Sequence, residues 1–501
     1  MTKQQTRKAE RLNEWVLTLD QGTSSSRVLA INSQGEVVAQ SKRPLETIRS
    51  QAGWAEWEAE ILLKSQLEAL EEVLAQVALA EASPIALSVA SQRSTVVLWD
   101  KETGEALTPV LSWQDGRAKR EAEAVSIDQA TIHQATGLYK TPFYSAAKIT
   151  WAIKHIPAVS KAAAQNRLCI GPVASYLIWH LTDGKVFACD PTLAQRTLLF
   201  NIQKWDWDEQ LLQAFGVQKN WLPEIKQTQA DYGYYKCGKW QIPITVCVGD
   251  QQAALCAMRV DREQTCINYG TGAFFMRHTG PQCHLLPGIL TSVGVTTGKQ
   301  ERAYLLEGPV NACATVFSWL QSIGFNFSME DLDKLCQKSK APIWFLPALG
   351  GLGAPYWDFK VSPVMGGFSP YSTLPDVLAG AVQGITLLLA DIVFYIEKAG
   401  LTNPTIKVMG GLSKSQSLLQ FQADILQRPL IPCQESESTC LGAAMLAAQQ
   451  LGWSVEAWHT GTVLPAVTPQ ITPQQAQERY RYWQHFVTQC RSSVKEKSIG
   501  I

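Results

Sequence analysis

The residues with the clearest chemical potential form a short turn near the start of the chain, Asp20-Gln21-Gly22-Thr23. The turn lies between two apolar runs, which predicts two strands joined by a tight loop. Glycine lets backbone N–H groups approach an anion and threonine adds a hydroxyl donor, so such a turn can hold a phosphate group. A similar segment, Tyr269-Gly270-Thr271-Gly272, recurs far downstream. Two copies predict two lobes that hold one nucleotide between them.

Asp20 adds a carboxylate to the first turn. Mg²⁺ prefers hard oxygen ligands, and phosphate needs amide and cationic donors. Asp20, with Thr23 and Arg27 close by in sequence, therefore suits a metal and a phosphate together. The alternative is a plain hairpin turn, because Asp and Gly are common turn residues.

A second carboxylate follows another apolar run, in Gly249-Asp250-Gln251-Gln252. The run from Ile242 to Val248 predicts a buried strand, and open α/β sheets place their chemistry at the carboxyl ends of such strands. Asp250 there could accept the proton of a substrate hydroxyl as that hydroxyl attacks a γ-phosphate. The alternative is a helix N-cap, because Asp250 precedes a helical pattern that we expect to begin at Gln252.

Two further groups carry weaker signals when taken alone. Gly410 and Gly411 end an apolar run, and their missing side chains would let a ribose and an adenine lie on the backbone. A tight turn from strand to helix explains the same pair. Arg93 could direct a donor at a substrate hydroxyl, and Trp113 could form an apolar wall. The ordinary alternatives are an ion pair for Arg93 and a core position for Trp113.

The elements that must position these residues are those of an α/β protein. Alternating apolar residues from Trp15 to Gln40 predict three strands joined by turns, and helical spacing predicts a helix from Glu58 to Ala80. Strand, turn and strand restart at Cys266, so we expect the first lobe to end near residues 256 to 262. Other expected elements are strands at 85–91, 242–248, 303–306 and 406–409, and helices at 146–156, 174–181, 311–323, from 374 onward and, as the last large helix, 439–450.

The composition limits the class of protein. With 501 residues, 46% of them hydrophobic, the chain is longer than one core usually supports, so two domains are expected. Lys+Arg and Asp+Glu number 44 each, and this balance favours a small-molecule partner over nucleic acid or an anionic membrane. The sequence also lacks GxxxxGK[ST], GxSxG and HExxH motifs, which disfavours a P-loop enzyme, a serine hydrolase or a metallohydrolase.

Two features favour a cytoplasmic protein. The twelve cysteines are scattered singly, which is typical of reduced core residues, and the polar N-terminus lacks a secretory signal. The most apolar stretch, from Val377 to Tyr395, is interrupted by Gln383 and Asp391, so we expect a buried helix there in preference to a membrane span.

The ordered set of motifs resembles the FGGY carbohydrate kinase family, and the glycerol kinases in particular, over nearly the whole chain. The matching segments are Leu17 to Arg27, Ser91-Gln92-Arg93, Ser112 to Asp115, Phe143-Tyr144-Ser145 with Lys148 and Trp151, Arg196 to Ile202, Gly249 to Leu255, Asn268 to Gly272, Leu352 to Asp358, Phe421 to Leu426 and Leu441 to Ala444. The resemblance implies an α/β fold with two actin-like (ribonuclease H-like) lobes, whose mixed β-sheets are flanked by helices, and a nucleotide cleft between them. It also implies that ATP and Mg²⁺ serve the transfer of a γ-phosphate to a hydroxyl of a small polyol or sugar. We expect lobes at 14–258 and 259–492 after a polar extension at 1–13, and a homo-oligomer, dimer or tetramer.

Matched position by position, the resemblance implies roles for named residues. Asp250 is implied as the general base and, with Asp20, as a ligand of Mg²⁺. The residues implied on the acceptor are Arg93, Ser94, Trp113, Phe143, Asp250 and Gln251. The residues implied on the nucleotide are Gly22, Thr23, Ser24, Arg27, Gly270, Thr271, Ala314, Ser318, Gly410, Gly411 and Ser415.

Several positions depart from the glycerol kinase pattern. Ser94 stands where those enzymes carry an acidic residue, and Phe143 where they carry a tyrosine. A buried hydroxyl without its partner costs about 1–3 kcal/mol, so the acceptor could be a longer polyol or a ketose. Tyr144 is expected to replace the phenol only after a local shift, because neighbouring strand residues point to opposite faces. The other departures, which concern the nucleotide and regulation, are Ala174, Gln241, Ala314, Ser318 and Met409.

Two functions of a different class remain open at this point. One is a catalytically weak paralogue that binds nucleotide and acts as a regulatory protein, for which the changed acceptor positions argue. The other is an actin-like ATPase or chaperone, which would have no use for a pocket formed by Arg93 and Trp113.

Overall fold

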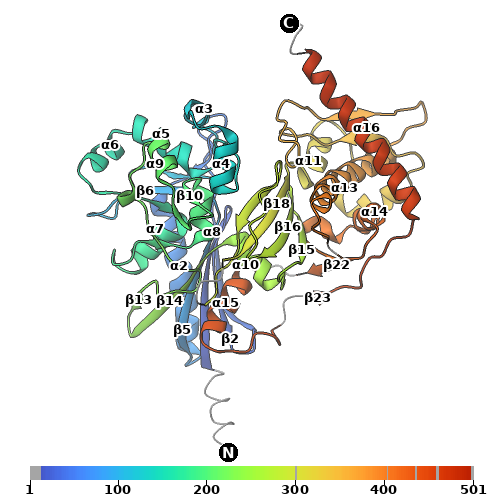
Figure 1. Cartoon of the computed structure of the whole chain (residues 1–501). Coiled ribbons are helices and arrows are strands. Elements are labelled where there is room, and N and C mark those ends of the chain that lie inside the picture. Colours follow the sequence, from blue (N-terminus) through green and yellow to red (C-terminus); the bar gives the residue numbers. More distant parts are fainter. Residues whose placement is uncertain (1–12, 299–301, 403, 435–436, 459–461, 498–501) are drawn as a thin grey trace, which may run out of the picture.

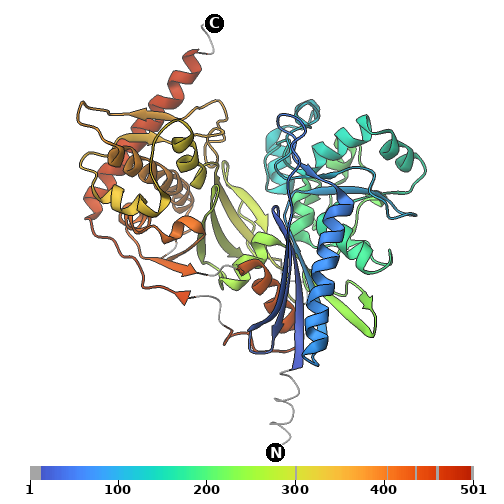
Figure 2. The ribbon, with the colours of Figure 1, turned by 180° about the vertical axis from the view of Figure 1, so that it is seen from behind.

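The computed structural model of the protein describes residues 13–298, 302–402, 404–434, 437–458 and 462–497. Figure 1 shows two lobes that meet at one end and diverge toward the other, each built around its own sheet. The view from behind in Figure 2 shows the same division, with the long helix α2 (Ala59–Leu79) along the outer side of the first lobe. The expected polar extension lies outside the described residues except for Asn13.

The sheet of the first lobe brings together three strand ends that carry predicted site residues. Its strand order is β13 (Tyr234–Cys237), β14 (Trp240–Gly249), β5 (Ser83–Ser91), β1 (Glu14–Gln21), β2 (Ser25–Asn32) and β3 (Val37–Pro44). β5 runs parallel to both β1 and β14, and Ser91 is in register with Gln21 on one side and with Gly249 on the other. The carboxyl ends of parallel strands meet at one edge of a sheet, so the turn after Asp20, the segment of Arg93 and Asp250 start from neighbouring positions.

The sheet of the second lobe repeats this arrangement. Its strand order is β17 (Leu290–Val293), β18 (Tyr304–Val310), β16 (Ala273–Gly280), β15 (Thr265–Tyr269), β21 (Ile406–Met409), β22 (Leu430–Gln434) and β23 (Thr462–Val463). β15 is antiparallel to β16 and parallel to β21, with Asn268 in register with Met409. The second Gly-Thr turn therefore lies beside the Gly410-Gly411 loop.

The first lobe carries a subdomain beside its main sheet. A four-stranded sheet has the order β4 (Glu56–Trp57), β7 (Val110–Leu111), β6 (Val96–Asp100) and β8 (Leu168–Pro172). The other elements of this region are the strands β9 (Ala188–Cys189), β10 (Phe200–Asn201), β11 (Asp206–Trp207) and β12 (Glu224–Ile225), the helices α3 (Lys119–Ala124), α4 (Gln129–Thr136), α5 (Ser145–His155), α6 (Pro157–Ala164), α7 (Val173–Leu181), α8 (Pro191–Ala194) and α9 (Glu209–Phe215), and the 3₁₀ turns η2 (Gln195–Thr197) and η3 (Lys219–Trp221).

The second lobe is built around the apolar helix α13 (Leu374–Lys398). This helix has the length and apolarity of a membrane span, but 89% of its apolar window is buried inside the protein, as expected for a core helix. The other elements of the lobe are α11 (Ala314–Ser322), η4 (Met329–Asp331), α12 (Leu332–Gln337), β19 (Trp344–Leu346), β20 (Val364–Gly366), η5 (Gly411–Lys414), α14 (Gln416–Leu426) and α16 (Pro473–Lys497).

Two helices join the lobes. α10 (Asp250–Ala257) packs against α15 (Ser438–Gln450), and α15 also contacts β1, β5 and β14 of the first sheet. Cys440 and Ala444 of α15 share one buried cluster with Val16 and Leu29. A helix from late in the sequence thus completes the core of the first lobe.

Most of the expected elements are present, with boundaries that differ by a few residues. The prediction that 439–450 is the last large helix is wrong, because α16 follows it and has 25 residues. α16 is polar apart from a narrow stripe of buried residues at Ala476, Trp483, Val487 and Cys490, so its hydrophobic pattern is weak. It docks on α13, where Asp391 accepts hydrogen bonds from Tyr480 Oη at 2.8 Å and Trp483 Nε1 at 2.9 Å.

Candidate active site between the lobes

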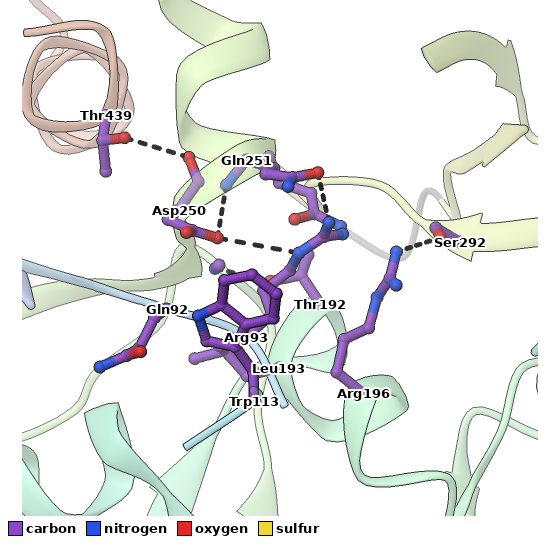
Figure 3. A network of polar contacts seen from close by, with 12 residues as sticks. Gln92, Arg93, Trp113, Thr192, Leu193, Arg196, Asp250, Gln251, Ser292 and Thr439 are labelled. Atoms are coloured by element: carbon purple, nitrogen blue, oxygen red, sulfur yellow. Dashed lines mark hydrogen bonds and ion pairs between the residues drawn. The ribbon is translucent and has the colours of Figure 1, made fainter. Parts of the chain in front are cut away.

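Asp250 lies at the point where β14 turns into α10. Gly249 is the N-cap residue and Asp250 is the first residue of the helix, so the N-cap alternative for Asp250 is wrong, as is the expected helix start at Gln252. Asp250 Oδ1 accepts a hydrogen bond from the Gln251 amide at 2.8 Å and lies 3.7 Å from Arg93 Nε (Figure 3). The backbone at this point is held by a bond of 2.8 Å from Gly249 N–H to Thr192 Oγ1.

The pKa values of the Asp250 and Asp20 carboxyl groups are both raised above the ordinary value for aspartate. The Asp250 side chain is 32% exposed, because it faces the space between the lobes while protein surrounds it elsewhere. Burial raises its pKa, against the lowering effect of the Arg93 charge and the Gln251 amide. For Asp20, burial and then the charge of Asp250 raise the pKa to about 7. A higher pKa makes a carboxylate a stronger base, as proton abstraction from an alcohol requires.

The same two carboxylates fit a site for Mg²⁺ together with phosphate. The charge of Asp250 raises the cost of ionising Asp20, and a divalent cation would remove that cost. In the part of the chain that the structure describes, no group of three or more His, Cys, Asp or Glu could form a metal cage from protein ligands alone. Mg²⁺ is typically held by one or two carboxylates plus substrate phosphates, which matches Asp20 and Asp250.

Arg93 is held by side chains from both lobes. Its guanidinium forms an ion pair of 2.8 Å with Glu307 of β18 and hydrogen-bonds Gln251. Glu307 also pairs with Arg196. Arg196 donates in addition to Ser292 Oγ at 2.6 Å (Figure 3). The Arg93 side chain is 8% exposed and that of Glu307 only 2%, so this ion pair is almost fully shielded from solvent. Two positive and two negative groups, counting Asp250, balance one another here.

Trp113 connects the predicted acceptor site to the first Gly-Thr turn. Its ring is 40% exposed, and its indole N–H donates to Thr23 Oγ1 at 3.0 Å. The Thr23 hydroxyl in turn donates to Gln92 Oε1 at 3.3 Å. A hydrogen bond therefore connects Trp113, the wall of the predicted acceptor site, to the candidate phosphate turn.

The segment around Phe143 differs from what the sequence predicts. It is a turn that leads into α5, with Tyr144 as the N-cap residue, and not a strand. Phe143 is 46% exposed, whereas Tyr144 is partly buried and lies near the charges of Arg196 and Glu307. Burial raises the pKa of this phenol, so it stays protonated as a donor and acceptor. The alternation of strand side chains does not apply in a turn, so the reason given for a local shift of Tyr144 is wrong.

The first Gly-Thr turn uses part of its donors internally. Gly22 N–H donates to Ser25 O at 3.1 Å, so the inward-facing donors must come from the residues after it, Thr23 and the exposed Ser24. Arg27 follows on β2 and forms an ion pair with Glu437, just before α15. Arg27 therefore connects the phosphate turn to the helix that joins the lobes.

The second Gly-Thr turn joins β15 to β16 and contacts the start of a helix. Gly270 N–H donates to Gly272 O at 2.9 Å, two residues on, whereas the bond from Gly22 N–H reaches three residues on. The Gly270 and Thr271 carbonyls accept from Ala314 N–H at 3.1 Å and Cys313 N–H at 3.0 Å at the start of α11. Ala314 and Ser318 are four residues apart on α11 and therefore share one face of it, with Ser318 exposed.

The Gly410-Gly411 loop lies beside this turn and has two different glycines. Gly410 has φ +93°, and a Cβ there would lie 2.5 Å from Tyr269 O, so the fold itself requires glycine. A Cβ on Gly411 would have no neighbour within 4 Å, so Gly411 borders open space that a flat ligand could use. The Ser415 hydroxyl caps α14 and donates to Asp333 Oδ1 at 2.6 Å, which gives it a structural role in this arrangement.

The comparisons with known proteins agree with this geometry. The N-terminal domain of the FGGY family of carbohydrate kinases matches residues 15–257, and its C-terminal domain matches residues 265–451. The chain belongs to the FGGY family of carbohydrate kinases. It is 34% identical to a glycerol kinase of Shewanella pealeana, over 95% of this chain and 99% of that one. It is also 32% identical to a glycerol kinase of Dichelobacter nodosus, over 96% and 100%.

A solved structure gives the same result for the fold. The glycerol kinase of Plasmodium falciparum with ADP superposes with a TM-score of 0.90 at 25% identity, over 95% of this chain and 98% of that chain. The predictions of the family, of a two-lobed α/β fold and of a phosphotransferase acting on an alcohol group are confirmed. As an FGGY kinase, the protein acts on a small molecule.

The structure brings most of the predicted residues together and adds others. Around Asp250 lie Arg93, Gln251, Asp20 and, through Thr23, Trp113. No role for Arg196, Glu307 or Glu437 was predicted from the sequence, and the strand assumed at Tyr144 is a turn. For Arg196 and Tyr144 a signal existed, since both lie inside motifs of the family resemblance. Glu307 was detectable only as a charged residue within an apolar strand.

Proposed function

We propose that the protein is a kinase that transfers the γ-phosphate of ATP to a hydroxyl of a neutral small polyol, as its glycerol kinase relatives suggest by name. The observation that carries the proposal is the position of Asp250, which lies 3.7 Å from Arg93 Nε, accepts a hydrogen bond from the Gln251 amide and is close enough to Asp20 for its charge to raise the pKa of Asp20. A base at that point is within reach of an alcohol held by Arg93 and of a phosphate held by the first Gly-Thr turn. ATP as the donor is supported by the ADP in the Plasmodium falciparum structure.

In this proposal Asp250 removes the proton of the acceptor hydroxyl as its oxygen attacks the γ-phosphate. Asp20 and Asp250 would hold Mg²⁺, which supplies charge stabilisation for the phosphate oxygens when it is bound. The acceptor would contact Arg93, Ser94, Trp113, Phe143 and Gln251, with Tyr144 as an additional partner. The nucleotide would lie along Gly22, Thr23, Ser24, Arg27, Gly270, Thr271, Ala314, Ser318, Gly410 and Gly411.

The balance of charges supports an uncharged acceptor. Arg93 and Arg196 both already face Glu307, and Asp250 lies 3.7 Å from Arg93. An acceptor carboxylate would have to displace one of these pairs, and leaving one charge of a buried ion pair without its partner costs about 3–5 kcal/mol. A sugar acid is therefore disfavoured relative to a polyol or ketose of the same length.

The departures at Ser94 and Phe143 favour one alternative, a kinase for a polyol longer than glycerol or for a ketose. A coupled assay of ADP release separates the candidates, with glycerol, erythritol, ribitol, xylulose and gluconate as acceptors. We expect acceleration by at least one neutral polyol or ketose and none by gluconate. ADP binding without acceleration by any acceptor would favour the nucleotide-binding paralogue instead.

We also propose that the lobes divide at 258/259 and that the protein works in the cytoplasm. Support for the division is that β15, the first strand of the second sheet, begins at Thr265. Support for the compartment is that all twelve cysteines are free thiols, many of them buried. A homo-oligomer stays an expectation from the family resemblance, which size-exclusion chromatography with light scattering tests.

A further inference from the structure

Lys148 is a fully buried lysine beside the acceptor site. It lies in the first turns of α5 (Ser145–His155), and its side chain has no exposed surface. Its ammonium donates three hydrogen bonds, all to backbone carbonyls: to Ser94 O at 2.8 Å, Ser112 O at 2.6 Å and Phe143 O at 3.0 Å. An ammonium has three N–H donors, so this set of bonds uses all of them.

The three carbonyls belong to three of the segments that carry the proposed acceptor-binding side chains. Ser94 follows Arg93 after β5, Ser112 precedes Trp113 after β7, and Phe143 lies in the turn before α5. These segments come from separate parts of the first lobe and share no strand or helix. The Lys148 ammonium is the point where all three meet.

The segment at Ser94 shows why such a point is needed. Ser94 has φ +62°, a left-handed conformation that costs a non-glycine residue stability and persists only when its surroundings hold it. Its carbonyl accepts from Lys148 at 2.8 Å and from Ser145 Oγ at 3.2 Å, both on α5. The strained turn that directs Arg93 toward Asp250 is therefore fixed from α5.

We propose that Lys148 is the positioning residue of the acceptor site, whose ammonium holds the segments of Arg93, Trp113 and Phe143 in one arrangement. Lys148 does not touch the acceptor itself. It keeps the donors and the apolar wall at the spacing that an acceptor hydroxyl needs in order to face Asp250. A displacement of about 1 Å in such a site can reduce the rate about a hundredfold. The inference rests on the proposed function, because it needs these segments to bind the acceptor.

Burial and hydrogen bonding act on the charge of Lys148 in opposite directions. Burial lowers the pKa of its ammonium to about 7, opposed by the Asp115 carboxylate and reinforced by the Arg117 guanidinium. A neutral amine has only two N–H donors and would leave one of the three carbonyls without a partner. The three carbonyls therefore favour a charged ammonium at position 148 over a neutral amine or an apolar side chain.

The test compares Lys148→Met with Lys148→Gln and with the control Lys226→Met. Lys226 lies in the same lobe and also donates to a backbone carbonyl, Asp231 O at 2.9 Å, but it belongs to none of the three acceptor segments. Each variant is assayed with the best acceptor of the wild-type protein, and ADP binding is measured by calorimetry. We expect the KM for the acceptor to rise about tenfold to a hundredfold in Lys148→Met, and less in Lys148→Gln, which keeps two donors. The ADP dissociation constant should stay within about twofold in all variants.

The possible outcomes are distinguishable. An unchanged acceptor KM in folded Lys148→Met, or in folded Lys148→Gln should the Met variant not fold, would overturn the positioning role. A parallel loss of ADP affinity would also overturn it, because a general weakening of the fold would then explain the effect. Should the wild-type protein show no acceptor-dependent turnover, it is the proposed kinase function that fails.

Discussion

Replacing Glu307 with Gln tests the network that joins the two lobes at the acceptor site. The substitution removes one charge and leaves the side-chain volume almost unchanged. Burial alone would oppose ionisation of Glu307, but the charges and hydrogen bonds of Arg196 and Arg93 outweigh it and lower the pKa from 4.5 to about 2. One unit of pKa corresponds to about 1.4 kcal/mol, so the network stabilises the folded state by about 3 kcal/mol at pH 7.

The sign of this contribution follows from the depressed pKa. It is fully present above the ordinary carboxyl pKa and is lost as the pH falls through about 2. Removing one partner of a buried ion pair typically costs about 3–5 kcal/mol, which agrees with the free energy obtained from the pKa shift of Glu307. In Glu307→Gln, Arg93 and Arg196 would repel each other in a nearly dry site, and the acceptor would meet a displaced Arg93.

Urea unfolding at pH 7, followed by tryptophan fluorescence, measures the difference in the free energy of unfolding. We expect Glu307→Gln to lose about 3 kcal/mol and to raise the KM for the acceptor at least about tenfold. The control is Glu72→Gln, because Glu72 pairs with Arg43 at 2.6 Å on the surface and should be replaceable with little effect. A Glu307→Gln protein as stable as the control, with an unchanged acceptor KM, would refute the network.

Three further predictions concern the nucleotide side and the wall of the site. The kcat/KM for ATP with Mg²⁺ should fall as the pH drops through about 7, because Asp20 must be ionised to hold the metal and burial raises its pKa to about 7. A pH profile in which kcat/KM falls only near the ordinary carboxyl pKa would contradict this. Gly410→Ala should lower both the melting temperature and the affinity for ADP, because its Cβ would lie 2.5 Å from Tyr269 O, whereas Gly411→Ala should keep the melting temperature. Calorimetry of both variants tests this, and a Gly410→Ala protein with an unchanged melting temperature would be evidence against it. Trp113→Phe loses the indole bond of 3.0 Å to Thr23 and should reduce the acceptor kcat/KM about fivefold in the coupled assay, and an unchanged value would mean that the wall and the phosphate turn act separately.

The fold was predictable where the hydrophobic pattern is strong and local. Alternating apolar residues around Asp20 and the helical spacing of α2 both correspond to elements in the structure. α16 was missed, because its buried stripe is narrow within a polar sequence. The boundary at Asp250 was also wrong, because a helix can begin directly at a strand end when glycine serves as the N-cap.

Only those parts of the candidate site that lie within single sequence motifs were predictable from the sequence. Asp20, Arg93 and Asp250 lie at the ends of parallel strands, and this follows from topology rules applied to the sequence. The pairing of Arg93 with Glu307 joins residues 214 positions apart and depends on how the lobes dock. The direction of Tyr144 depends on a turn before α5. Neither docking nor that turn has a signature in the local sequence.

The role of Asp250 as the general base for an alcohol that faces ATP is tested most directly by Asp250→Asn. The amide keeps the size and the hydrogen bond to Gln251 but cannot take up a proton. With the best acceptor, we predict that kcat falls by about 10²–10⁴ while the dissociation constants of ADP and acceptor change little. A variant that retains near-normal kcat would contradict the account.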